Sequence, residues 1–198
     1  MTMFIRLKHI HFWTFALLLG ISAHAQPAAA RMGAVLDFSY TRFDSELHFN
    51  PGTGLGGGLF YAVLPRVGVE LGAHRNGSRR EFDLAGGRDG IDLSLNTLLL
   101  EIHWKALRLP GLLNVSLSGG LGALHIDRKA YNLSLGALGQ RSLPAESDTY
   151  TLFSLGAAFN RHLGSRVFIR LAPQAQFFSA SGMKTNLHIK GGLGVVFF

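Results

Sequence analysis

One stretch of sequence decides the fold class: residues 67–74 read VGVELGAH. Apolar side chains occupy every second position of this stretch, and glycine or a polar residue fills each position between them. Successive side chains of a β-strand point to opposite faces, so this period of two predicts a strand with one apolar face and one small or polar face. In a membrane barrel the apolar face would contact lipid and the other face would line the lumen.

The same alternation recurs on both sides of this stretch. Apolar-alternating segments of about 10 to 14 residues follow one another, which is the length that a tilted transmembrane strand requires. We expect eight strands, at about residues 32–43, 53–64, 66–77, 91–105, 112–126, 148–161, 166–178 and 186–198. Single-chain bacterial barrels have an even number of strands, and eight satisfies this rule.

The composition also favours a membrane barrel. Hydrophobic residues make up 47% of the chain and charged residues only 16%, against about 25% charged residues in a typical soluble domain. Residues 26–198 nevertheless contain no run of about 18 apolar residues that would form a transmembrane helix. A closed barrel is the other structure that pairs every backbone N–H and C=O inside a bilayer. The sequence therefore predicts an all-β fold, a transmembrane antiparallel up-and-down β-barrel of about eight strands.

The connections between the expected strands alternate in length. Three are short, at residues 64–66, 106–111 and 162–165, and four are longer, at residues 44–52, 78–90, 127–147 and 179–185. Outer-membrane barrels have short periplasmic turns and longer external loops. A soluble barrel has no reason to sort its connections in this way, so the alternation favours the membrane barrel, with both termini on the periplasmic side.

The N-terminus has the parts of a cleavable signal peptide. Two basic residues precede the apolar segment 10–21, which is too short to span a bilayer, and residues 23–25 read AHA, an Ala-x-Ala cleavage site. We expect a signal peptide over residues 1–25 and an outer-membrane barrel domain over residues 26–198.

Export bears on charge and on partners. Removal of the signal takes away Arg6 and Lys8, so the net charge falls from +7 to +5 (7 − 2). An exported chain does not meet nucleic acid, and we expect anionic outer-membrane lipid as its partner instead. The chain has no cysteine, so no disulfide and no lipid-modified N-terminus are expected.

Three places depart from ideal alternation. The apolar side chains change phase near Asn96 and Thr97, which predicts a β-bulge there. Pro173 lacks a backbone N–H, so its strand is expected to bulge or bend locally. In the last strand the alternating apolar set ends on Phe197, one residue out of phase with Phe198.

Glycine-rich segments carry a resemblance to a known family: GLGGGLFY at residues 54–61, VGVELG at 67–72, GGLG at 119–122 and KGGLGVVFF at 190–198. Over residues 31–198 the chain resembles the small eight-stranded outer-membrane β-barrels, which include the OmpA membrane domain, OmpX-like proteins and PorT-like barrels. The resemblance implies an outer-membrane location. It also implies that the barrel-insertion machinery reads the end of the last strand, here Phe197 and Phe198.

Charged residues share the inward phase of several strands. Three acids and two bases are expected to meet in the lumen, namely Asp37, Glu70, Glu101, Arg170 and Lys190. Three histidines have the same phase, at His74, His103 and His188. Charges inside a barrel are costly unless they are paired and hydrogen-bonded. We interpret them as an ion-pair network that closes the lumen, with a catalytic or proton-linked site as the alternative.

No cofactor or metal is expected. Residues 52–57 read GTGLGG and match the G-x-G-x-x-G pattern formally. A dinucleotide site needs a strand before this pattern and a helix after it, whereas here strands follow. The glycines are better explained by the room that they leave for large neighbours in a narrow barrel. The nine histidines are scattered along the chain, without a metal-binding pattern.

Some small outer-membrane barrels are enzymes that act on lipid A, and those that remove acyl chains use a His–Ser pair on the lipid-facing surface. A serine nucleophile needs its base within hydrogen-bond reach. His-x-Ser spacing would put both residues on one face of one strand, and no histidine of this chain has that spacing. No catalytic residue is therefore predicted. A lipid A-modifying enzyme of the outer leaflet, with a pair formed between strands, stays as an alternative.

Basic residues lie in the expected external loops, at the level of lipopolysaccharide phosphates, which guanidinium groups pair in bidentate fashion. The candidate contacts are Arg79, Arg80, Arg88, Arg128 and Lys129. A solvated loop surface is the alternative interpretation. The longest loop, 127–147, shows apolar alternation, which suggests strands that continue above the membrane and a surface for a protein partner.

These observations favour a non-enzymatic outer-membrane barrel with a structural, adhesive or secretion/assembly-accessory role. A soluble periplasmic binding barrel of the lipocalin kind is the alternative architecture. A passive pore is disfavoured, because eight strands leave a lumen just wide enough for side chains.

Cell fractionation tests the architecture. We expect the protein in the outer-membrane fraction, with gel migration that changes on heating because an intact barrel is more compact than the unfolded chain. Recovery in the periplasmic extract would indicate the lipocalin-like barrel instead.

Overall fold

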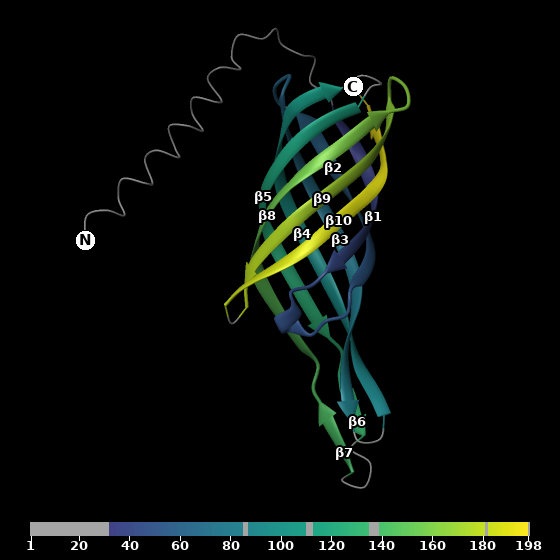
Figure 1. Ribbon diagram of the computed structural model, residues 1–198, viewed down its shortest axis with the longest axis vertical. Helices are drawn as coiled ribbons and strands as arrows, with labels where there is room; N and C mark the ends of the chain where they lie inside the picture. Colours follow the sequence, from purple (N-terminus) through teal and green to yellow (C-terminus); the bar gives the residue numbers. More distant parts are fainter. Residues whose placement is uncertain (1–31, 85–86, 110–112, 135–138, 181, 198) are drawn as a thin grey trace, which may run out of the picture.

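A computed structural model of the chain describes residues 32–84, 87–109, 113–134, 139–180 and 182–197. Eight long strands form a closed antiparallel barrel (Figure 1). They are β1 Met32–Arg42, β2 Gly52–Ala62, β3 Val67–Leu84, β4 Gly87–Leu109, β5 Leu113–Arg128, β8 Glu146–His162, β9 Val167–Ser179 and β10 Met183–Val196. β1 pairs with both β2 and β10, which closes the barrel. The expected fold class is therefore confirmed.

Shorter elements lie in two of the connections. The 3-10 helix η1 (Ser45–Leu47) follows β1. Between β5 and β8, β6 (Tyr131–Ser134) pairs with β7 (Gln140–Leu143) in a separate two-stranded sheet. Strands therefore do form within residues 127–147, as the alternation there predicted. No helix among the described residues is long and apolar enough to cross a membrane.

The period of two decides which side chains face lipid. On β3, Leu71 is 50% exposed whereas Glu70 is 3% exposed. The same separation on β8 and β9 leaves one set exposed, Phe153, Leu155 and Leu171, and buries another, Ser154, Arg170 and Gln174. The exposed apolar side chains form the surface that lipid covers, and polar side chains line the lumen.

The connection expected at residues 78–90 is not a loop. β3 runs to Leu84, β4 begins at Gly87, and their ladder continues as far as that pair. The two strands form a hairpin that projects beyond the barrel at the same end as β6 and β7 (Figure 1). The prediction failed because a charge-rich segment suits a solvated two-stranded ribbon as well as it suits a loop.

Strands also take up part of residues 179–185, which leaves only 180–182 between β9 and β10. Short and long connections therefore do not alternate as strictly as the sequence predicted. The extra length at one end of the barrel is carried mainly by extended strands.

β4 contains no bulge at residues 96–97, so that prediction was wrong. Its register is continuous there and shifts instead between Lys105 and Leu107. The apolar phase changes because the lumen changes: Leu95 is buried inside the barrel in an apolar cluster, whereas Leu98 is exposed on the outer face. One regular strand thus passes from an apolar to a polar part of the interior.

Pro173 interrupts one ladder of β9 without shifting its register. Pairing between β8 and β9 lapses after Gly156–Gln174 and resumes at Phe159–Leu171 with the same offset. On its other side Pro173 stays in register with β10. A local gap in the ladder, and not a bulge, accommodates the missing N–H.

β10 ends at Val196, and the backbone N–H of Phe197 donates to the carbonyl of Met32 at 2.7 Å. The Phe197 side chain is exposed. Phe198 lies outside the described residues, and recognition of this end by the insertion machinery stays a prediction.

Candidate functional site

Two ion pairs cross the lumen. Arg170 on β9 places Nη1 2.9 Å from Oε1 and 2.8 Å from Oε2 of Glu70 on β3. Lys190 on β10 places Nζ 2.9 Å from Oε2 of Glu101 on β4. All four side chains are almost completely buried. Each pair therefore joins distant strands through groups that would be costly to bury alone.

The two acids of these pairs are neighbours. Glu70 and Glu101 lie directly opposite each other in the β3–β4 ladder, and like charges in such positions repel. The two cations, which come from β9 and β10, offset this repulsion. Gln174 and Ser154 also donate hydrogen bonds to Glu101. Ser154 is a partner that the sequence did not identify, because its contact with Glu101 depends on the registers of β4, β5 and β8.

Asp37 lies beside a histidine. Its Oδ2 is 3.5 Å from Nε2 of His74, and His103 places its own Nε2 3.3 Å from Oε2 of Glu70. Three carboxylates against the two cations of Arg170 and Lys190 give the lumen network a net charge of −1 (2 − 3) while the histidines are neutral. The five residues singled out from the sequence thus share one interior.

Glycines make room for this network. A Cβ added at Gly192 would lie 2.4 Å from Oδ1 of Asp37, and one added at Gly120 would lie 2.8 Å from Cγ of Glu101. A Cβ at Gly56 would lie 2.2 Å from the ring of His74. The G-x-G-x-x-G match at residues 52–57 lies within β2, where its glycines admit side chains from β3, a context unlike that of a phosphate loop.

A metal ion would compete with the ion pairs. Glu70, Glu101 and His103 offer ligand atoms that all lie within 4.8 Å of one another. Both carboxylates, however, already bind the cations of Arg170 and Lys190. The arrangement therefore fits an ion-pair network better than a metal centre.

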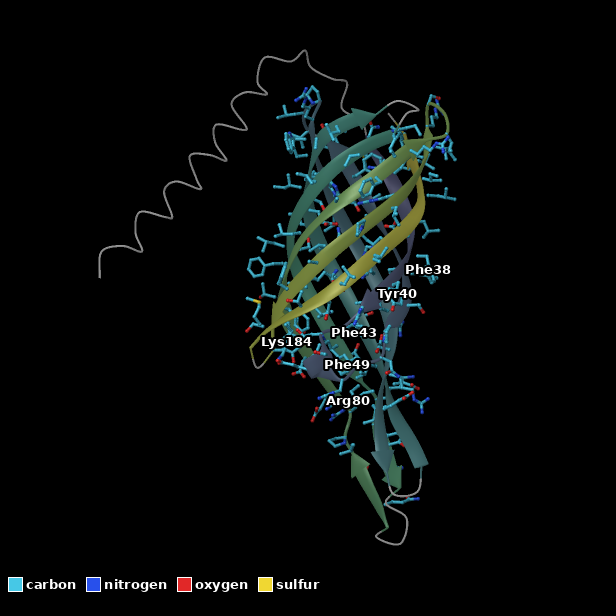
Figure 2. All side chains as sticks on the ribbon, in the orientation of Figure 1. Phe38, Tyr40, Phe43, Phe49, Arg80 and Lys184 are labelled. Atoms are coloured by element: carbon cyan, nitrogen blue, oxygen red, sulfur yellow. The ribbon has the colours of Figure 1, made fainter. Side chains whose placement is uncertain are left out.

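An apolar cluster fills the end of the lumen nearest the projecting hairpins. It consists of Phe43, Leu93, Leu95, Leu99, Leu124, Leu152 and Phe178. Leu47 and Phe49, from the segment around η1, pack against it, and the rings of Phe43 and Phe49 meet edge to face at 5.6 Å. Figure 2 shows these two rings at the mouth of the barrel, where Lys184 also lies.

Polar contacts hold the η1 segment over this mouth. The Asp44 carboxylate accepts hydrogen bonds from the backbone N–H of Glu46 and of Thr185, each at 3.0 Å, and Lys184 pairs with Glu46. These N–H donors, that of Glu46 first, lower the pKa of Asp44 below its ordinary value. Because the folded pKa is the lower one, this contribution to stability is present at neutral pH and is lost as pH falls through the lowered value.

The opposite end of the lumen is open. A cavity of about 640 Å³ lies among the short turns and reaches up to Glu70, His103 and Arg170. Asn160 and Ser116 add further polar groups to its wall. The charge network thus separates a polar vestibule from the apolar cluster.

A second polar group lies on the outer face. Nδ1 of His125 on β5 is 2.8 Å from Oγ1 of Thr149 on β8, and its Nε2 is 3.0 Å from Oδ1 of Asp127. Nδ2 of Asn96 donates to Oδ2 of Asp127 at 3.1 Å. His-x-Ser spacing within one strand does not predict this histidine–hydroxyl contact, because the two residues are cross-strand partners.

Several external basic residues are engaged by acids. Arg128 pairs with Glu146 at 2.6 Å, and Arg79 lies 4.0 Å from Asp92. Lys129 is exposed, and the side chain of Arg88 lies outside the described part of the structure. Contacts of Arg79, Arg80, Arg88, Arg128 and Lys129 with lipopolysaccharide stay a prediction.

A family model described as "Outer membrane protein beta-barrel domain" matches residues 13–186. The chain belongs to this family. It is accordingly an outer-membrane barrel protein, as the resemblance implied. No curated protein matches the sequence significantly.

Solved structures share the fold. Neisserial surface protein A is 10% identical, with a TM-score of 0.63 over 86% of this chain and 100% of that one. OprG from Pseudomonas aeruginosa is 14% identical, with a TM-score of 0.56 over 86% and 97%. Ail of Yersinia pestis, in complex with the heparin analogue sucrose octasulfate, is 13% identical, with a TM-score of 0.52 over 86% and 100%.

The variant Arg170→Met tests the lumen network. It leaves Glu70 buried without its cation, so we expect the free energy of unfolding to fall by about 3–5 kcal/mol. Urea unfolding of the barrel refolded in lipid vesicles measures this. Arg42→Met, at an exposed position, is the matched control. The double variant Glu70→Gln with Arg170→Met should recover much of the loss, and wild-type stability of Arg170→Met would refute the role of the pair.

Proposed function

We propose that this outer-membrane protein is a closed, non-catalytic surface barrel that binds a protein partner through its projecting β3–β4 hairpin, which is an adhesive role. The length of the β3–β4 hairpin beyond the membrane supports the proposal. On the outer face of β3, apolar Ala73 is followed by Arg75, and the strand then continues to Leu84. These nine further residues (84 − 75) extend about 30 Å at roughly 3.3 Å per residue.

In the described part of the chain, no third strand pairs with the projecting hairpin beyond its base. β2 pairs with β3 only as far as Gly77, and β5 pairs with β4 only as far as Leu93. Beyond these points the two strands form a ladder with each other. Asn50 contacts the base of this ladder: its N–H donates to the carbonyl of Arg79, and its carbonyl accepts from the hydroxyl of Ser78. Open strand edges accept a further strand from a partner, by main-chain hydrogen bonds.

The charge of the hairpin favours a protein over a polyanion. Three basic residues within 78–92 stand against four acidic ones, a net charge of −1 (3 − 4). Ail was crystallised with a sulfated heparin analogue, but a sulfated polymer would be repelled by a hairpin of this charge. Mixed charge suits a protein surface, where charges of both signs give specificity.

The interior supports a role outside the lumen. Ion pairs bridge the middle of the lumen, and the apolar cluster with the η1 segment covers the external end. A narrow lumen filled in this way offers no path for a solute.

A shortened hairpin tests the adhesive role. Arg79 and Asp92 are directly opposite in the ladder, so Asn-Gly can replace residues 80–91 as a two-residue hairpin turn. We expect adhesion of bacterial cells to host-cell monolayers to fall to that of cells lacking the protein, because the open edges are lost.

The matched control replaces residues 133–141 of the β6–β7 hairpin with Asn-Gly, between the opposite pair Asn132 and Ser142. Heat-dependent gel migration of both variants verifies that the barrels fold. Full adhesion by both variants would overturn the proposal.

A second candidate function rests on the contact between His125 and Thr149. With Asp127 on the other ring nitrogen, the histidine is placed as a base beside a hydroxyl, as in an acyl hydrolase. Such chemistry also needs donors about 3 Å from the developing oxyanion. Asn96 and Arg75 lie two and three strands away from Thr149, at about 4.8 Å per strand. The donors are therefore remote, which favours the non-catalytic proposal.

Mass spectrometry of lipid A decides between the two functions. We expect identical acyl patterns from cells that produce wild-type protein, Thr149→Val or no protein at all. A deacylated species that appears with wild-type protein and disappears with Thr149→Val would support the enzyme and refute the non-catalytic proposal.

A further inference from the structure

The outer face of three consecutive strands changes from apolar to polar at one level. On β3, β4 and β5 the outward positions pass from Ala73, Leu98 and Ala123 to Arg75, Asn96 and His125. Cross-strand register continues this polar row to Thr149 on β8. Below the row, outward residues such as Leu100 and Leu121 are apolar and more than half exposed. The row therefore lies where the hydrocarbon of the outer leaflet gives way to headgroups.

A groove crosses this level. It has a volume of about 410 Å³ and is lined by Leu55, Ala73, Leu98 and Ala123 on the apolar side, and by Arg75, Asn96 and His125 on the polar side. Ala73 and Ala123 flank Leu98 on its two neighbouring strands. Their small side chains leave a hollow between larger apolar neighbours such as Leu55 and Leu98.

Arg75 differs from the external cations described above. Its Nε donates to the hydroxyl of Ser94 at 3.2 Å, and no carboxylate among the described residues lies within ion-pair distance of its guanidinium. Arg79 and Arg128, by contrast, each face an acid of the chain itself. The terminal nitrogens of Arg75 therefore provide a positive charge that a bound anion can neutralise, and the planar guanidinium suits a phosphate.

We propose that this groove binds the lipid A moiety of one lipopolysaccharide molecule, with an acyl chain against Ala73 and Ala123 and a phosphate on Arg75. Two features select this occupant. The groove is open to lipid at the headgroup level, and the guanidinium of Arg75 is complementary to an anionic headgroup, whereas Asp127 is already engaged by Asn96 and His125. His125 and Asn96 are held by Thr149 and Asp127, so Arg75 is the group that binds the phosphate. The site goes beyond the adhesive role, which uses the projecting hairpin.

Native mass spectrometry of the full mature barrel in detergent tests this, with diphosphoryl lipid A as the probe and dephosphorylated lipid A as the comparison. Wild-type protein should retain one diphosphoryl lipid A in preference to the dephosphorylated form. Arg75→Gln should weaken that binding on the order of tenfold, because a charge-assisted hydrogen bond to phosphate is lost. Ala73→Leu and Ala123→Leu should reduce retention of both lipids, because they fill the groove.

Matched controls keep the result specific. Arg42→Gln removes another exposed outer-face cation, and Ala175→Leu enlarges another outward alanine, on β9. Both should retain lipid A as wild type does, and heat-dependent gel migration verifies that every variant folds. Equal binding by Arg75→Gln and wild type, or equal losses with Arg42→Gln, would overturn the proposal. So would a wild-type dimer that Ala73→Leu dissociates, because a second copy of the chain would then occupy the groove.

Discussion

A chain that crosses a bilayer as strands must pair every backbone N–H and C=O with another strand, because lipid offers no partner. The ladder between β1 and β10 meets this requirement by joining the first strand to the last. Closure over eight strands then determines the width of the lumen and the direction of the side chains. It makes the lumen narrow, so inward side chains must fit against one another, and it turns the other half of each strand toward lipid. Glycine opposite bulky acids and apolar residues outside are both consequences of that one geometry.

The sequence predicted what depends on one strand at a time. The alternation around Leu71 identified the lipid face correctly, because the period of two is a local property of extended chain. It failed where the environment changes along a strand. Leu93 and Leu95 face inward although they are apolar, since the η1 segment and its Phe49 cover that end of the lumen. The sequence of β4 alone suggested a β-bulge as the cause of the phase change. The structure shows instead that the η1 segment packs against these inward leucines.

In the charge network, too, local features could be predicted from the sequence and contacts between strands could not. The inward phase of Glu70 and Arg170 could be predicted from the sequence, because phase is local. Their contact could not, since 100 residues separate them and their meeting depends on the offset of each ladder between β3 and β9. The contact between His125 and Thr149 escaped for this reason too. A pattern search within one strand cannot find partners that register alone brings together, which is why the outer-face polar group became visible only with the fold.

The outer face turns polar at one level. This level divides β3 and β4 into a part that faces lipid and a part that is exposed to water. Below Arg75 and Asn96, β3 and β4 must present apolar side chains, and their edges must be paired by β2 and β5. Above it water can satisfy the backbone, so the same two strands leave the barrel and need no further neighbours. The open edges of the hairpin and the cation at Arg75 therefore have a common origin. Both lie at or beyond the point where the bilayer stops dictating which groups a strand can expose.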